Sequence, residues 1–123
     1  KLIHFTFKSQ IESMPVLLNS SLYNWTIENL VKNGIDAMRG KGSIAIEIVP
    51  DGKLVHILIA DTGHGIPKSN FSAIFNPGVT SKKRGWGLGL SLVKRIVENY
   101  HEGKIFVKQS DATGTTFRIV LNK

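Results

Sequence analysis

The sequence contains no cysteine, which excludes disulfide bonds, thiol nucleophiles and thiolate metal sites. It has no apolar run near the roughly 20 residues that span a bilayer, and its first residues, KLIHFTFK, lack the core of a signal peptide. There is no GxxxxGK(S/T) loop, and Gly85, Gly87 and Gly89 do not have the GxGxxG dinucleotide spacing. We therefore expect a soluble single domain, residues 1–123, that has no disulfide or thiol chemistry and binds no ligand through either of these two glycine-rich phosphate motifs. Because it starts with Lys1 rather than Met, we expect it to come from a longer protein.

The charge is strongly of one sign, with a formal net charge of +7. Such a balance is compatible with binding to nucleic acid or to an anionic membrane. The cations are dispersed along the chain, except for Lys82, Lys83 and Arg84, which lie beside glycines. A bound nucleotide alone would explain this cluster, so we expect no nucleic-acid partner.

Hydrophobic periodicity predicts strands, then a helix, a hairpin, an irregular stretch, a second helix and a final hairpin. The Asp51-Gly52 pair predicts a tight turn between antiparallel strands. The glycine-, proline- and lysine-rich stretch 61–86 is long enough to suggest a functional loop, with a helical turn near 69–75. The expected strands are 3–7, 16–18, 43–50, 53–60, 104–109 and 115–121, and the expected helices are 20–39, capped by Asn19 or Ser20, and 87–100.

The polar face of the first predicted helix carries residues at spacings of three and four: Glu28, Asn29, Lys32, Asn33 and Asp36. A solvated face would explain the charged members. Two asparagines one turn apart are less expected, because asparagine competes with the backbone for hydrogen bonds and is a mediocre helix former. An amide oxygen suits a hard cation such as Mg2+.

Two glycine-rich motifs follow. In DTGHGI, residues 61–66, an Asp that ends a strand is placed beside glycines whose backbone can approach a planar ligand. In GWGLGL, residues 85–90, three glycines lead into a helix, and the free N–H groups of a helix N-terminus favour an anion. Each motif alone could equally be an ordinary turn or a loop joined to a capped helix.

Four segments occur in a fixed order: ENLVKNGIDAM, DTGHGI, FSAIFNP and GWGLGLSLVKRIVE. They resemble the N, G1, F and G2 boxes of the GHKL ATPase superfamily, and most closely those of the catalytic domain of sensor histidine kinases. The resemblance covers roughly residues 15 to 121. It implies an α+β fold of the Bergerat type, a two-layer sandwich in which a mixed, mostly antiparallel sheet has helices on one face and a mobile ATP lid.

The resemblance also implies site residues. Asn33 would bind Mg2+, Asn29 would help to hold the metal-triphosphate unit, and Lys32 would contact phosphate. Asp61 would accept from the adenine amino group. The remaining nucleotide contacts would come from the G1 box, the lid and the G2 box: Gly63, Gly65, Ile66, Thr80, Gly87, Leu88 and Gly89.

The catalytic residues that the resemblance implies are Glu28, Asn29 and Lys82. Glu28 would orient or deprotonate the attacking group, although it could instead be a solvent-facing partner of Lys32. In the lid, residues 76–86, Thr80, Lys82 or Arg84 could reach the γ-phosphate.

Three positions depart from the family pattern. Gly34 stands where Ala is usual, Gly78 and Val79 replace an aromatic pair, and Trp86 stands where Thr is common. Trp86 could stack near the nucleotide or cover the hinge of the lid.

The implied activity is transfer of the ATP γ-phosphoryl group to a His on a separate dimerisation domain, and then to a response regulator. None of the histidines here lies in a phosphoacceptor motif, so that domain is expected elsewhere in a homodimeric parent protein. The domain would be cytoplasmic, with membrane anchoring of the parent left open.

Two alternatives to the kinase function remain: an ATPase clamp of the gyrase, MutL or Hsp90 type, and a nucleotide-binding scaffold. Asn29, where the clamps have an acidic residue, favours the kinase.

Overall fold

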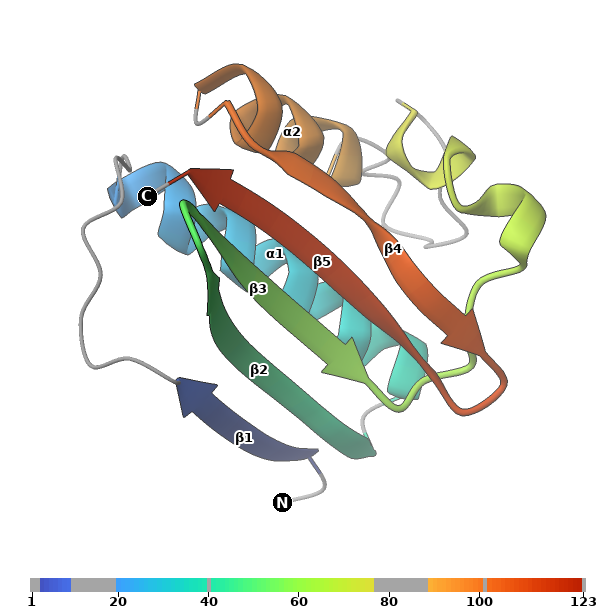
Figure 1. Ribbon diagram of the computed structural model, residues 1–123. Helices are drawn as coiled ribbons and strands as arrows, with labels where there is room; N and C mark the ends of the chain where they lie inside the picture. Colours follow the sequence, from blue (N-terminus) through green and yellow to red (C-terminus); the bar gives the residue numbers. More distant parts are fainter. Residues whose placement is uncertain (1–2, 10–19, 40, 77–88, 101, 123) are drawn as a thin grey trace.

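The protein is a two-layer sandwich in which helices cover one face of a five-stranded sheet (Figure 1). The computed structural model describes residues 3–9, 20–39, 41–76, 89–100 and 102–122. The helices are α1 (Ser20–Met38) and α2 (Gly89–Arg95). The predicted fold class is therefore confirmed. The predicted strand 16–18, the Asn19 cap and most of the predicted lid lie outside the described residues.

The sheet has the strand order β1-β2-β3-β5-β4. Among the described strands, β1 and β2 pair in parallel, whereas β2–β3, β3–β5 and β5–β4 are antiparallel. The predicted turn at Asp51-Gly52 is present, and Gly52 has the positive φ of 61° that such a turn demands. The strand bounds are β1 Ile3–Ser9, β2 Gly42–Asp51, β3 Leu54–Asp61, β4 Lys104–Asp111 and β5 Gly114–Asn122.

The helices differ from the sequence prediction mainly at their ends. After α1, Arg39 adopts a left-handed φ of 56°. The second helix continues from α2 into a π-helical segment, η3 (Ile96–Tyr100), which periodicity did not predict. The predicted helical turn near 69–75 is two short 3-10 helices, η1 (Lys68–Asn70) and η2 (Ala73–Phe75). None of the described helices has the length and hydrophobicity needed to cross a bilayer.

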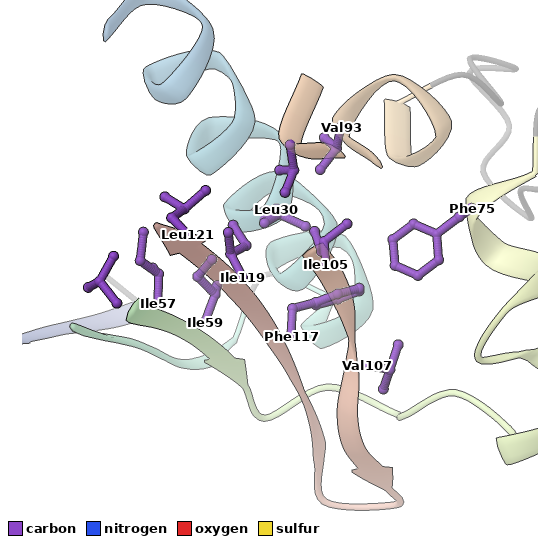
Figure 2. Close-up of a cluster of buried hydrophobic side chains, with 12 residues drawn as sticks. Leu30, Ile57, Ile59, Phe75, Val93, Ile105, Val107, Phe117, Ile119 and Leu121 are labelled. Carbon is purple, nitrogen blue, oxygen red and sulfur yellow. The ribbon is translucent and has the colours of Figure 1, made fainter. Parts of the chain in front are cut away.

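The core lies between the sheet and the helices, where alternate residues of β3 and β5 face inward. Figure 2 shows these side chains meeting Leu30 of α1 and Val93 of α2, which are 1% and 0% exposed. The core cluster is Leu30, Val55, Ile57, Ile59, Phe75, Val93, Val97, Ile105, Val107, Phe117, Ile119 and Leu121. Burial on this scale fixes α1 and α2 against the same sheet face.

Strand β1 lies at one edge of the sheet, and two of its aromatic side chains are exposed. Phe5 and Phe7 pair in register with Ile44 and Ile46, so they lie on the helix side of the sheet. They are nevertheless 62% and 65% exposed. The described helices therefore do not cover this part of the face.

Candidate functional site

Asp61 ends β3 and is half-buried. Its Oδ1 accepts the N–H of Gly63 at an N···O distance of 2.8 Å, and the carboxyl also accepts the N–H of Thr115. Burial raises the pKa of the Asp61 carboxyl, and the two N–H donors and nearby His64 counteract this effect. The result is a fixed, partly desolvated acceptor of the kind that recognises an amino group.

Helix α1 approaches Asp61 through Gly34. A Cβ at Gly34 would lie 3.0 Å from the Cβ of Asp61 and 3.3 Å from its Oδ2. Glycine therefore gives the room for this close approach, where the family pattern has Ala. The contact brings together the helix that carries Asn29 and Asn33 and the strand end that carries Asp61, as the sequence predicted.

The loop after Asp61 is packed on two sides. On the α1 side, a Cβ at Gly63 would lie 2.6 Å from that of Ala37, whose carbonyl oxygen accepts the N–H of His64 at 3.3 Å. On the other side, the buried Gly65 lies against the β4–β5 hairpin, and its φ is +88°. The contacts that the structure gives for both glycines are with protein. Their predicted place beside the base stays a prediction.

Two hydroxyl residues of the β4–β5 hairpin lie at this site, and sequence reasoning missed both. The Oγ of Ser110 accepts the N–H of Ile66 at 2.7 Å, and it lies 2.7 Å from the Oγ1 of Thr115. Thr115 is buried and pairs in register with Asp61. The sequence signal that could have indicated them is Gly-Thr-Thr at the start of β5. Its glycine, Gly114, packs directly on the Asp61 carbonyl, which brings the hairpin to this site.

The polar face of α1 is as expected, and its side chains have local partners. The Nδ2 of Asn29 donates to the carbonyl oxygen of Trp25 at 2.9 Å. This bond uses the amide nitrogen and not the oxygen that a metal would need. Asn33, half-buried, follows one turn later. Lys32 pairs with Glu28 at 3.6 Å, with both side chains more than 60% exposed. Because such pairs contribute only about 0.3–0.5 kcal/mol, either side chain could turn to a ligand at little cost.

The F-box segment is anchored by Phe75. Its ring is 7% exposed and meets the ring of Phe117 edge-on, with centroids 6.2 Å apart. The Nζ of Lys94 lies 5.6 Å from the centroid of the same ring. Gly89 begins α2, but the predicted ligands Thr80, Lys82, Gly87 and Leu88 lie outside the described residues.

The donor set fits magnesium only as part of a complex with a phosphate ligand. Among the described residues, no three His, Asp or Glu side chains are grouped so that they could hold a metal ion. Mg2+ is usually bound by one or two protein oxygens together with substrate phosphates and water. An Asn amide oxygen on α1 satisfies that requirement.

Comparison with known proteins agrees with this geometry. The family model described as histidine kinase-, DNA gyrase B- and HSP90-like ATPase matches residues 21–123. Sporulation kinase A of Bacillus subtilis (strain 168) is 39% identical over 95 residues, which are 77% of this chain and 16% of that protein. Sensor histidine kinase ZraS of Escherichia coli (strain K12) is 40% identical over 93 residues, which are 76% of this chain and 20% of that protein.

Solved structures give the same picture. The nucleotide-free catalytic domain of histidine kinase ThkA superposes with a TM-score of 0.88 at 31% identity, over 98% of this chain and 79% of that one. ThkA in complex with the response regulator protein TrrA superposes with a TM-score of 0.84 at 30% identity, over 98% of this chain and 34% of that one. The chain spans about a fifth or less of the curated relatives named above. It belongs to the histidine kinase-, DNA gyrase B- and HSP90-like ATPase family, and is an ATP-binding catalytic domain of the sensor histidine kinase type.

Proposed function

We propose that residues 1–123 form one catalytic unit that binds Mg-ATP and phosphorylates a His on a separate dimerisation domain. The observation that carries this proposal is the position of Asp61. Its half-buried carboxylate accepts two backbone N–H groups and lies directly against the helix that bears Asn29 and Asn33. A single Mg-ATP molecule can contact both a base-recognising carboxylate and a metal-binding amide only if the end of β3 and helix α1 lie side by side.

In this proposal different residues contact the adenine base, the metal ion and the triphosphate of the ligand. Asp61 accepts from the adenine amino group, beside Gly63, Gly65 and Ile66. Asn33 holds Mg2+, which would neutralise phosphate charge when bound, while Asn29 and Lys32 contact the triphosphate. Phosphate contacts would also come from Thr80, Lys82, Gly87, Leu88 and Gly89.

The transfer itself is mainly positioning and charge stabilisation. A bond forms between the imidazole nitrogen and the γ-phosphorus, the bond from that phosphorus to the β–γ bridging oxygen breaks, and ADP leaves. Glu28 would take the proton of the attacking imidazole. The phosphoryl group would pass on to the Asp of a response regulator, and the ThkA–TrrA complex supports a partner of this class.

The decisive experiment mixes the domain with the dimerisation domain of its own parent protein and radiolabelled ATP. Acid-labile, base-stable phosphate on that domain identifies a phosphohistidine. Free phosphate without transfer would favour the ATPase clamp, and binding with neither outcome would favour a scaffold. Asp61→Ala should abolish binding of an ATP analogue in calorimetry, while Asn33→Ala should lose Mg-dependent transfer and keep adenosine binding.

The same proposal places the domain in the cytoplasm, as part of a homodimeric parent protein, and leaves open whether that parent is anchored in the inner or plasma membrane. Fractionation of cells that produce the full-length parent, with an antibody to this domain, tests that placement.

A further inference from the structure

The hydroxyl of Ser110 links two groups on either side of Asp61. It accepts the N–H of Ile66 at the end of the loop, with an N···O distance of 2.7 Å. It also shares a 2.7 Å hydrogen bond with the Oγ1 of Thr115, which is 4% exposed. Thr115 in turn pairs in register with Asp61 and donates its N–H to the Asp61 carboxyl. Thr115 therefore contacts the Asp61 carboxyl through its backbone N–H and Ser110 through its hydroxyl, and Ser110 in turn holds the far end of the loop.

Ser110 reaches this position because β4 contains a bulge. Ile105 and Val107 are buried and face the core, and strict alternation would place residue 109 on that side next. The register shifts between Val107 and Gln109, so that Ser110 instead stands opposite the buried Thr115. Bulges of this kind redirect side chains and are frequent beside functional sites.

Beyond Asp61, the described residues of the loop meet the hairpin at Gly65 and at Ile66. Gly65 packs on the carbonyl of Asp111, which is a steric stop and not a bond. The hydrogen bond from Ile66 to Ser110 supplies the attraction. Its loss would leave a half-buried N–H without that acceptor, so the loop would move to find another.

We propose that Ser110 is a positioning residue for base recognition, because it holds the loop 61–66 against the β4–β5 hairpin and so fixes the surroundings of Asp61, which would accept from the adenine amino group. The inference rests on the proposed function, since it names a residue that acts through Asp61. Ser110 itself touches no ligand in this scheme.

The test compares the affinities of the Ser110→Ala variant and the wild-type domain for two nucleotides, a non-hydrolysable ATP analogue and inosine triphosphate. The affinity for inosine triphosphate is measured by its competition with the ATP analogue. Inosine carries a carbonyl group where adenine has its amino group, so it reports on the rest of the site. Ser110→Ala should weaken the ATP analogue about tenfold and leave inosine triphosphate within about twofold. The Ile66 amide should also exchange with deuterium faster.

Thr113→Ala is the matched control, because it removes a hydroxyl from the same hairpin that bonds only to Asp111 among the described contacts. It should leave both affinities and the Ile66 exchange rate unchanged. Equal weakening of both nucleotides by Ser110→Ala would mean a purely structural role and would overturn the proposal, as would an unchanged ATP affinity. If the Ala variant is unfolded at the assay temperature, Ser110→Cys carries the same comparison, since a thiol keeps the volume but accepts weakly.

Failure of the proposed function would look different. A wild-type domain that binds no ATP analogue would remove the proposed site as a whole, whereas tight wild-type binding with an unchanged Ser110→Ala variant would remove only the role of Ser110.

Discussion

Replacement of Gly65 by Ala should detach the Asp61 loop from the β4–β5 hairpin. Gly65 has a φ of +88°, and a Cβ there would lie 2.0 Å from the carbonyl oxygen of Asp111. Ordinary contact begins at 3.4 Å, so the two segments must separate by about 1.4 Å. That separation would stretch the 2.7 Å bond from Ile66 to Ser110 well past hydrogen-bond distance.

The expected cost follows from these two effects. An alanine in a left-handed conformation costs about 1–2 kcal/mol, and loss of the hydrogen bond adds about 1 kcal/mol. Gly65→Ala should therefore lower the free energy of unfolding by about 2–3 kcal/mol in urea denaturation. Calorimetry should show at least an approximately tenfold loss of affinity for an ATP analogue, because the displaced loop carries Asp61.

Gly52→Ala is the control for backbone strain alone. Gly52 has a φ of +61°, and nothing lies within 4 Å of a Cβ built there. It should cost about 1–2 kcal/mol and leave nucleotide affinity unchanged. If Gly65→Ala is no less stable than Gly52→Ala and binds as the wild type does, the reasoning about the packed loop is refuted.

Three further predictions concern the carboxylate, the core and the exposed ion pair. Burial raises the pKa of Asp61, so its contribution to stability falls as pH rises through the interval between its unfolded and folded pKa values. Asp61→Asn should therefore raise the urea midpoint at pH 7, and an unchanged midpoint would contradict the reasoning from burial. The same variant should abolish binding of the ATP analogue. The affinity of the wild-type domain for the analogue should fall on acidification, at a pH above the ordinary aspartate range. Leu30→Ala, at a position 1% exposed, should cost about 2–5 kcal/mol in urea denaturation, against less than about 1 kcal/mol for Leu92→Ala at 39% exposure. Glu28→Gln should change stability by less than about 0.5 kcal/mol because its pair with Lys32 is exposed. A large loss of phosphotransfer in that variant would then indicate chemistry, and full activity would leave only the solvent-facing role.

Most of the fold could be predicted from the sequence because its signals are local. The Asp51-Gly52 turn, the alternation in β3 and β5 and the helical spacing of α1 each depend on residues that are close together in the sequence, and the structure confirms all of them. The π-helical segment after Arg95 was not predictable from periodicity, because it changes the period without changing the composition.

The site divides in the same way. The asparagines of α1 and Asp61 could be singled out because each lies in a compact motif. Ser110 could not, since its position depends on a register shift in β4 and on pairing with residues far away in the sequence. The burial of Gly63 and Gly65 against protein was also unpredictable, because glycine in a loop looks the same whether it faces a ligand or a neighbouring segment.

The exposed edge strand affects how the isolated domain will behave at the concentrations that these assays need. In the part of the chain that the structure describes, no strand pairs with the outer edge of β1, so its backbone groups, with Phe5 and Phe7 beside them, make a template for strand addition between molecules. The net charge of +7 opposes such self-association by repulsion, but salt screens that repulsion over about 8 Å at physiological ionic strength. The sedimentation coefficient should therefore rise with protein concentration more steeply in high salt than in low salt, and a charged residue in place of Phe7 should flatten both curves.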